Sequence, residues 1–435
     1  MQPVLMDVLE EHLNEAAFLW SQWESALVSA SHGLEDTAEC EERLLAHVDG
    51  LVVGGEAAVG EVLLPGLETE ERERISAASL ALLAGGGKRE LRELLEVLDS
   101  GDEVQRAGIG RAMELSEREG LEAALLERLS SEDPTLRAQA FRMLAFRGAV
   151  PQEKRTQWLH EDEADPVIAA LRDARPLPRD VSQTVLPQLL VDPRPGVPEA
   201  ALLAGLVSGA RAAWKVCHKV AEEGGVGRRQ CFAVLALGGD ERDVGLLVGL
   251  LRQEELRADV LWALGFSGQA LAAEACLACM GDEGVAALAG EAFSAITGLR
   301  LEGEYRKAAE EEPDELIPLE EEDLDANLVP GPEARLPVPV PEAVKRWWQK
   351  AQKGFERNMR YLRGTKLDAG RLLEALGTEP MRRRPVLALE LAIRSRGAHL
   401  LQPRAFTLKQ RAQLRAALAG RASVSMNPFS KLFGI

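Results

Sequence analysis

The sequence has few of the residues that mark several common protein classes. Only 4% of its 435 residues are aromatic, although 46% are hydrophobic. Strands favour β-branched and aromatic side chains, so an apolar set dominated by Ala and Leu predicts packed helices. No apolar run approaches the roughly 20 residues that a membrane-spanning helix needs. The N-terminus lacks the basic start of a secretory signal.

Cysteine and histidine are also scarce. The five cysteines (40, 217, 231, 276 and 279) are an odd number scattered through helical patterns, which argues against a disulfide framework and favours a reduced, cytoplasmic protein. Cys276 and Cys279 have metal-binding spacing, but no second pair exists, so we expect two small side chains in a helix and no metal. The six histidines are dispersed, and we expect no catalytic residues, no cofactor and no enzyme activity.

Charge is unevenly distributed along the chain. The formal net charge is −19. Residues 342–435 hold 20 Lys/Arg and 6 Asp/Glu, a charge of +14, whereas the preceding residues hold 31 and 64, a charge of −33. This asymmetry predicts two parts that have different partners or that attract each other.

What the sequence does contain is an internal repeat. The segment "LRADVLWALGFSG" (256–268) matches "LRAQAFRMLAFRG" (136–148) in its apolar positions and its final Gly. Windows of this form begin at residues 75, 104, 136, 167, 197, 227, 256 and 286, and those at 104 and 167 are looser copies. The successive starts are 29 to 32 residues apart.

Each window predicts a helix with one apolar stripe. Positions 1, 5 and 9 are apolar and share a helical face, and an apolar position 6 widens it. Gly at position 13 suits the left-handed residue that ends a helix. A second amphipathic run precedes several windows, for example at 91–99, 121–130 and 243–253. A helical hairpin of about 30 residues cannot bury its own apolar face, so stacked neighbours must bury it.

This pattern resembles the HEAT-like α-solenoids, particularly the short bacterial repeats, over roughly residues 75–298. The repeat class tends to have a basic residue near the start of its second helix. This chain has Arg106, Arg137, Arg228 and Arg257 there. The copy that begins at 167 departs from the pattern, since "RPLP" (175–178) predicts an early helix end.

The expected fold is therefore all-α, with an α-solenoid of about eight hairpins and two helical flanks. The predicted parts are a helical N-terminal cap (1–74), the solenoid (75–298), an acidic then Pro-rich linker (299–341) and a basic helical C-terminal module (342–435). Trp20 and Trp23, three residues apart, are expected in the core of the cap.

The flanks narrow the resemblance. Together with the solenoid, "HLNEAAFLW" (12–20), "LPVPVPEAVKRWW" (336–348), "RYLRG" (360–364) and "RRRPVLALELAIRSRG" (382–397) resemble one uncharacterised proteobacterial family of HEAT-like proteins. Members of that family are often encoded near type VI secretion genes. The resemblance implies a partner that is a component or cargo of that secretion system.

Two groups of residues are candidate partner-binding sites. Trp262 and Arg142 stand at position 7 of their windows, away from the apolar stripe, although a Trp there can equally fill space between repeats. The second group lies in the basic module and comprises Arg346, Trp347, Trp348, Arg382, Arg383 and Arg384. A buried aromatic face is the preferred interpretation of its tryptophans, and docking of the module on the chain's own acidic segments fits its charge.

The favoured function is a non-catalytic scaffold or adaptor that binds another protein through the solenoid surface. One alternative is nucleic-acid binding through the basic aromatic module, where bases would stack on Trp347 and Trp348. The net negative charge weighs against this alternative, because it repels a polyanion. Another alternative is a lyase-like enzyme that acts on a bound partner.

Overall fold

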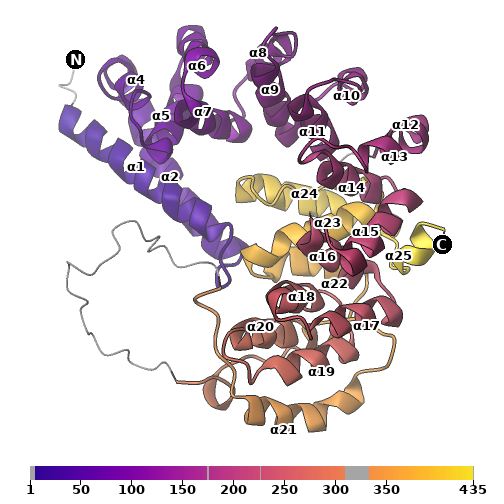
Figure 1. Cartoon of the computed structure of the whole chain (residues 1–435). Helices are drawn as coiled ribbons and strands as arrows, with labels where there is room; N and C mark the ends of the chain where they lie inside the picture. Colours follow the sequence, from indigo (N-terminus) through magenta and orange to yellow (C-terminus); the bar gives the residue numbers. More distant parts are fainter. Residues whose placement is uncertain (1–4, 174–175, 226, 309–332, 435) are drawn as a thin grey trace, which may run out of the picture. The chain divides into compact units, whose positions relative to one another are not determined.

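The computed structural model describes residues 5–173, 176–225, 227–308 and 333–434, and these are mostly helical (Figure 1). This confirms the all-α prediction. The chain divides into two compact units. Unit 1 comprises Met1–Trp214 and Leu376–Ser423, and unit 2 comprises Lys215–Ala375 and Val424–Ile435. Within the described ranges, no helix is both long enough and apolar enough to cross a membrane.

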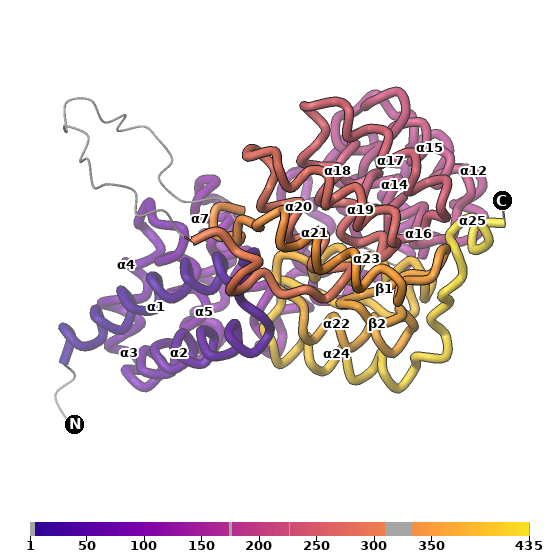
Figure 2. The backbone as a smooth tube through the Cα atoms, turned by 90° about the horizontal axis from the view of Figure 1, so that it is seen from below, coloured from indigo at the N-terminus to yellow at the C-terminus, as the bar shows by residue number. Residues whose placement is uncertain are grey.

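Unit 1 begins with two long helices that run side by side, α1 (Met6–Ala26) and α2 (Leu34–Val53) (Figure 2). Shorter helices follow them. These are α3 (Gly55–Ala58), the π-helix η1 (Val59–Leu63), α4 (Leu64–Gly66), α5 (Arg72–Gly85), α6 (Lys88–Ser100), α7 (Glu103–Leu115), α8 (Leu121–Arg128), α9 (Pro134–Arg147), α10 (Gln152–Trp158), α11 (Ala164–Arg172), α12 (Arg179–Thr184), α13 (Leu186–Leu189) and α14 (Val197–Val207).

The repeat windows of unit 1 lie on five helices that pack in sequence order, and we call these five the inner helices. Windows 75, 104, 136, 167 and 197 fall on α5, α7, α9, α11 and α14, and each of these helices packs against the next. Polar contacts link neighbouring inner helices. Ser76 Oγ donates to the Gly108 carbonyl at 3.2 Å, and Gln139 Nε2 donates to the Arg106 carbonyl at 3.0 Å. As predicted, α11 ends early, at Arg172.

Arginine side chains donate hydrogen bonds to the carbonyls at the C-terminal ends of these helices. Arg118 donates to the carbonyls of Leu83 and Gly86 at 3.1 and 2.6 Å. Arg147 donates to the carbonyls of Met113 and Ser116, which close α7. The last carbonyls of a helix have no partner inside the helix, so a planar guanidinium with several donors satisfies them.

The C-terminal part of unit 1 packs against its first two helices. It comprises the end of α22 (Ala369–Thr378), the 3-10 turn η5 (Met381–Arg383), α23 (Arg384–Arg394), α24 (Thr407–Ala419) and the 3-10 turn η6 (Arg421–Ser423). The Met381 and Arg382 amides donate to the carbonyls of His32 and Ser29 at 2.8 and 3.0 Å. Helix α24 packs on α2. Trp20 and Trp23 are fully buried beneath these contacts, as predicted.

Unit 2 contains the last three windows. Its helices and strands are the greater part of α15 (Arg211–Glu223), α16 (Arg228–Gly238), α17 (Glu241–Leu250), η2 (Glu254–Leu256), α18 (Arg257–Leu264), α19 (Ala270–Cys279), α20 (Ala286–Thr297), η3 (Gly303–Tyr305), α21 (Pro341–Ala351), η4 (Gln352–Gly354), β1 (Tyr361–Leu362), β2 (Thr365–Lys366) and α25 (Phe429–Leu432). Windows 227, 256 and 286 lie on α16, α18 and α20, which pack in that order.

The β1–β2 hairpin covers the ends of α18 and α20. The Tyr361 amide donates to the Gly268 carbonyl at 2.7 Å, and the Arg363 amide donates to the Ala295 carbonyl at 2.8 Å. Gly268 and Gly298 have φ of +69° and +79°. A Cβ atom there would lie 2.5 Å from the Tyr361 oxygen or 2.6 Å from the Arg363 oxygen. Both glycines therefore admit the hairpin backbone; Gly298 is the C-cap of α20, and Gly268 follows the turn after α18.

The prediction of a left-handed Gly at position 13 holds for some windows only. Gly148, Gly209, Gly268 and Gly298 have positive φ. It is wrong for Gly87 and Gly239, which have φ of −86° and −72°. The backbone at both glycines is extended, because the next helix follows closely: Gly87 is itself the N-cap of α6, and Gly239 directly precedes Asp240, the N-cap of α17.

The predicted basic module is divided between the two units, and part of the predicted linker belongs to unit 2. Residues 309–332 of the linker 299–341 lie outside the described residues. Its two ends pair, because the Lys307 amide donates to the Val338 carbonyl at 2.9 Å and the Val340 amide donates to the Tyr305 carbonyl at 2.9 Å. Residues 342–375 of the basic segment belong to unit 2, and residues 376–423 belong to unit 1.

We expect Glu41→Ala to destabilise unit 1 by about 2–4 kcal/mol. The buried Glu41 carboxylate accepts hydrogen bonds from Trp23 Nε1 at 2.9 Å and from the Thr407 amide at 2.8 Å. Each buried donor left without an acceptor costs about 1–3 kcal/mol. Urea unfolding and hydrogen exchange at the Thr407 amide measure the effect. Glu39→Ala, at an exposed site on the same helix, is the control. Equal unfolding midpoints for the two variants would contradict the prediction.

Candidate functional site

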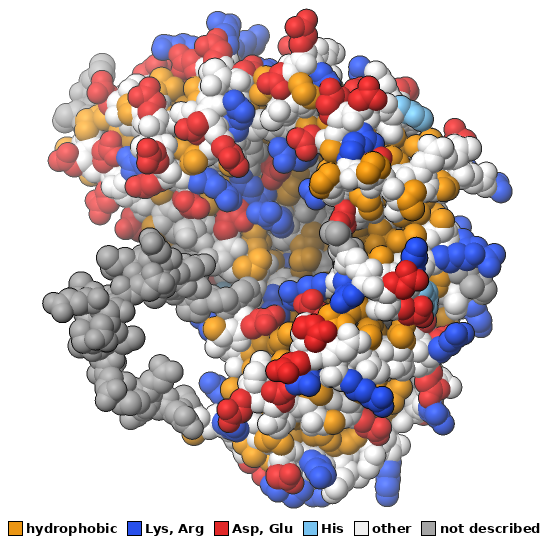
Figure 3. Space-filling model, in the orientation of Figure 1, with side chains coloured by type: hydrophobic (Ala, Val, Ile, Leu, Met, Phe, Trp, Pro, Cys, Tyr) orange, Lys and Arg blue, Asp and Glu red, His pale blue; other side chains and the backbone are white. Residues whose placement is uncertain are grey.

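Two cavities of unit 1 share part of their walls. The first, the apolar cavity, has a volume of about 420 Å³, and the second, the arginine cavity, has a volume of about 580 Å³. Glu114 and Arg142 line both. Figure 3 shows a hollowed surface with hydrophobic side chains inside it and Lys and Arg side chains at its edges. We call the two cavities together the unit 1 groove.

The apolar cavity lies between the inner helices and the C-terminal part of unit 1. Aliphatic and aromatic side chains from α9, α11, α14, α23 and residues 400–403 form most of its wall. These include Phe146, Leu171, Leu203, Val207, Pro385, Leu389, Leu400 and Leu401. Arg147, Arg172 and Asp173 also line it. A pocket of this size and lining is typical of sites that bury an apolar group and orient it with a few polar ones.

Five guanidinium groups line the arginine cavity. They come from three successive inner helices and from the C-terminal part: Arg72 on α5, Arg106 and Arg111 on α7, Arg142 on α9, and Arg404. Glu103 and Glu114 supply the carboxylates of the wall. Within the described residues, Arg72, Arg106 and Arg142 form no side-chain hydrogen bond and no ion pair.

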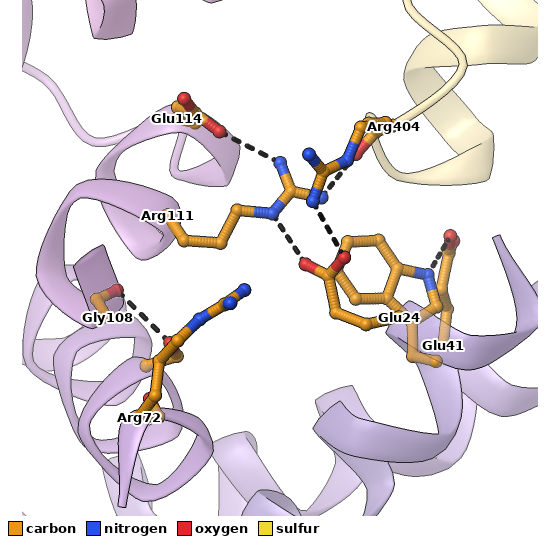
Figure 4. A network of polar contacts seen from close by, with 9 residues as sticks. Glu24, Glu41, Arg72, Gly108, Arg111, Glu114 and Arg404 are labelled. Carbon is orange, nitrogen blue, oxygen red and sulfur yellow. Dashed lines mark hydrogen bonds and ion pairs between the residues drawn. The ribbon is translucent and has the colours of Figure 1, made fainter. Parts of the chain in front are cut away.

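Arg111 and Arg404, in contrast, belong to a closed network (Figure 4). Arg111 Nε donates to Glu24 Oε1 at 2.7 Å, its Nη1 donates to Glu114 Oε2 at 3.0 Å, and its Nη2 donates to the Arg404 carbonyl at 2.7 Å. Arg404 Nη2 donates to the other oxygen of Glu24 at 2.9 Å. Arg72 lies beside this network, and no dashed line reaches its guanidinium.

The Arg111 guanidinium also packs on aromatic rings. Arg111 Cζ lies 5.1 Å from the ring centroid of Trp23 and 5.4 Å from that of Phe146. Trp23 is in turn held by Glu41, which accepts from its indole N–H at 2.9 Å. Cation–π contacts are strongest where the cation is desolvated, and Arg111 is only 5% exposed. The floor of the arginine cavity is therefore fixed in place.

Burial and ion pairing shift the three carboxyl pKa values differently. Burial acts to raise the pKa of Glu24, but the charges and hydrogen bonds of Arg111 and Arg404 outweigh it, so the pKa lies below its usual range. Burial dominates at Glu114 and raises its pKa, although Arg111 opposes the shift. Burial likewise raises the pKa of Glu41, opposed by the hydrogen bonds from Thr407 and Trp23.

The predicted candidates on the repeats have different fates. Arg142 is exposed and lines both cavities. Trp262 on α18 is buried, with its ring centroid 4.9 Å from that of Phe266 and 5.8 Å from Arg229 Cζ. Trp262 therefore fills space in unit 2, which was the second interpretation of that position.

The aromatic candidates of the basic segment form part of the core of unit 2. Trp348 is buried, and its ring centroid lies 5.5 Å from that of Phe293 and 6.4 Å from that of Trp347. Trp347 is half-buried and Arg346 is exposed. Of these three candidates, Trp347 and Arg346 are accessible in this structure and Trp348 is not.

The three consecutive arginines belong to unit 1. Arg382 is half-buried, whereas Arg383 and Arg384 are fully buried. Arg383 Nε lies 3.1 Å from Glu379 Oε2. Arg384 Nε donates to the Leu376 carbonyl at 2.6 Å, and burial lowers the pKa of Arg384 to about 10. The guanidinium groups of Arg383 and Arg384 thus act inside the fold.

Sequence reasoning missed most of the groove. The apolar wall from α23 and residues 400–403 gave no signal, because the helices that it meets lie at least 178 positions earlier in the chain, from Val207 to Pro385 at the nearest. Arg106 was noted for its place in the repeat, but Arg72 precedes its window and Arg404 lies in the distant flank. Arg72 lies three residues before its window, Arg106 is at position 3 and Arg142 at position 7, so no shared position in the repeat marks the arginine cavity in the sequence.

The chain was compared with known proteins. No family model and no curated protein matches it. Among solved structures, it is similar to the crystal structure of an engineered protein, at 19% identity over 64% of this chain and 88% of the other. The TM-score of 0.29 does not define a shared fold.

Metal-ligand side chains do not gather in the part of the chain that the structure describes. No group of three or more His, Cys, Asp or Glu residues there has a geometry able to hold an ion. Cys276 is buried and Cys279 is half-buried, and burial raises the pKa of both thiols.

We expect Glu24→Gln to destabilise unit 1 at pH 7 by about 2 kcal/mol, because it removes one of the two carboxylates that pair with the buried Arg111 guanidinium and leaves only Glu114. The folded-state pKa of Glu24 is below its ordinary value of 4.5, so the carboxylate stabilises the fold above that pH and loses this effect as pH falls through the folded-state pKa. The difference from the parent protein should shrink below about pH 4.5.

Urea unfolding at pH 7, 5, 4 and 3 measures this difference. Glu41, with its raised pKa, is present in both proteins and cancels in the comparison. The charge of Glu24 contributes to the raised pKa of Glu114, so the substitution also lowers the pKa of Glu114. Glu15→Gln, at an exposed site on α1, is the matched control. A difference that stays constant from pH 7 to pH 3 would contradict the role assigned to Glu24.

Proposed function

We propose that this chain is a non-catalytic protein-binding scaffold whose unit 1 groove receives a segment of a partner protein. The observation that carries the proposal is the apolar cavity of about 420 Å³, with Leu389 and Phe146 in its wall. Binding energy at protein interfaces concentrates where apolar anchors enter such desolvated pockets. The adjoining charged wall provides orientation.

The scaffold is proposed to be a HEAT-like α-solenoid of about eight helical hairpins. The packing of α5, α7, α9, α11 and α14 in sequence order supports this, as does that of α16, α18 and α20. So do the hydrogen bonds of Arg118 and Arg147 to backbone carbonyls, which reach back 31 to 36 residues. Contacts at one repeat length are what stacked hairpins of about 30 residues make.

The lining of the groove favours binding over chemistry. None of the described residues that line the two cavities is a His, Cys, Ser, Lys or Tyr. The groove offers guanidinium groups, carboxylates, one threonine hydroxyl and three glutamine amides among apolar side chains. These groups position a ligand, but they do not make up a nucleophile with its base.

The burial of Trp348, Arg383 and Arg384 weighs against the nucleic-acid alternative, because stacking and phosphate contacts require accessible side chains. The family resemblance makes a component or cargo of type VI secretion the first class of partner to test. We place the function in the cytoplasm, because the odd number of scattered cysteines favours a reduced protein.

We expect Leu389→Glu to reduce capture of the partner at least tenfold, because it puts a charge among the apolar side chains of the cavity. Leu389 is half-buried, so the fold should tolerate the change. A photo-crosslinking amino acid at position 389, followed by mass spectrometry, identifies the partner and the contact. Point variants of the full chain are required, because truncation before α21 would remove α23 and α24 from unit 1.

Leu408→Glu is the matched control. Leu408 is 73% exposed on α24 and does not line the apolar cavity. The proposal fails if the crosslinker at 389 captures no protein, or if both substitutions reduce capture equally.

A further inference from the structure

The arginine cavity holds positive charge that unit 1 does not neutralise. Every other arginine on the three helices that form its wall is ion-paired. Arg74 on α5 lies 2.8 Å from Glu10, Arg111 on α7 lies 2.7 Å from Glu24, and on α9 Arg137 lies 3.7 Å from Glu161 and Arg147 lies 3.2 Å from Glu122. The arginines left without a partner among the described residues are those that line the cavity, Arg72, Arg106 and Arg142.

We infer that Arg72, Arg106 and Arg142 bind acidic side chains of an extended segment of the partner, while neighbouring apolar side chains of that segment enter the apolar cavity. This inference rests on the proposed function and names the chemistry of the partner. A free guanidinium presents a planar fork of donors that matches a carboxylate. Because Arg142 and Glu114 line both cavities, one continuous ligand can occupy both.

The arrangement sets the spacing of the ligand. The three arginines stand on α5, α7 and α9, which pack one against the next. Packed helices lie about 8–10 Å apart, and an extended chain rises about 3.3 Å per residue. Acidic side chains about three residues apart would therefore meet successive guanidinium groups.

The carboxylates around the cavity favour an acidic peptide over a nucleic acid. Glu103 and Glu114 line the cavity, and Glu24 lies behind Arg111. They limit the positive field to a few spaced contacts, which suits carboxylates on a peptide. Double-stranded DNA carries one charge per about 1.7 Å. The adjoining wall is apolar, which fits leucine-like side chains and not a sugar–phosphate backbone.

The test uses the full chain as bait for a random 12-residue peptide library displayed on phage, with the enriched peptides sequenced. We expect enrichment of Asp and Glu at about three-residue spacing beside apolar residues. Synthetic copies of enriched peptides should bind about tenfold more weakly to Arg106→Ala or Arg142→Ala. They should bind unchanged to Arg92→Ala, which removes an exposed arginine of α6 outside both cavities. Equal urea midpoints verify that each variant is folded.

The outcomes separate this inference from the proposed function. Apolar peptides without acidic enrichment, lost with Leu389→Glu but not with Arg106→Ala, would overturn the inference and leave the scaffold proposal standing. No enriched peptide at all would overturn both. Labelled single-stranded DNA and polyphosphate are run in parallel, and tighter arginine-dependent binding of either would overturn the choice of an acidic peptide.

Discussion

The Arg111 guanidinium is the interaction on which unit 1 depends. It is buried, so it must be paired, since an uncompensated buried charge costs several kcal/mol. Its partners come from three places in the chain: Glu24 on α1, Glu114 on α7 and the carbonyl of Arg404. A single group thus ties the first helix, the inner layer and the C-terminal part. The buried Glu41 carboxylate acts in a similar way, because it accepts hydrogen bonds from Trp23 on α1 and from Thr407 in the C-terminal part.

This closure explains why residues 376–423 are part of unit 1 and are not a free basic module. Part of their positive charge is paired with carboxylates of unit 1: Arg383 pairs with Glu379 and Arg394 with Glu390 in the core, and Arg404 pairs with Glu24 nearer the surface. Helix α23 then supplies one wall of the apolar cavity. The groove exists only because the chain returns to its beginning, so its stability and its binding surface depend on the same contacts.

The inner helices could be predicted from the sequence, and the groove could not. Each of the eight windows overlaps a helix, because helix periodicity is local and each copy repeats it, although the window that begins at 167 continues beyond the end of α11 at Arg172. The contact of Glu41 with Thr407 spans 366 residues, and no local pattern encodes it. Trp348 is buried, in line with the preferred interpretation of the aromatic face. Arg383 and Arg384 have side chains that are common at interfaces, but packing and hydrogen bonds place them in the core.

In unit 1, an ion pair with a carboxylate of the protein therefore distinguishes the arginines that stabilise the fold from those that we infer bind the partner. Arg111 and Arg147 are paired and hold helices together. Arg72, Arg106 and Arg142 stand on the same three helices, yet each faces a cavity where no carboxylate of the protein meets it. Arg72 and Arg142 are exposed, so their guanidinium groups lose little by remaining unpaired, whereas Arg106 is half-buried and its Nε has no partner. Each gains a charge-assisted hydrogen bond when a carboxylate binds. The Arg111 network holds the base of the arginine cavity in place. Binding of the carboxylate therefore requires little reorganisation, since preorganised donors bind at lower entropic cost.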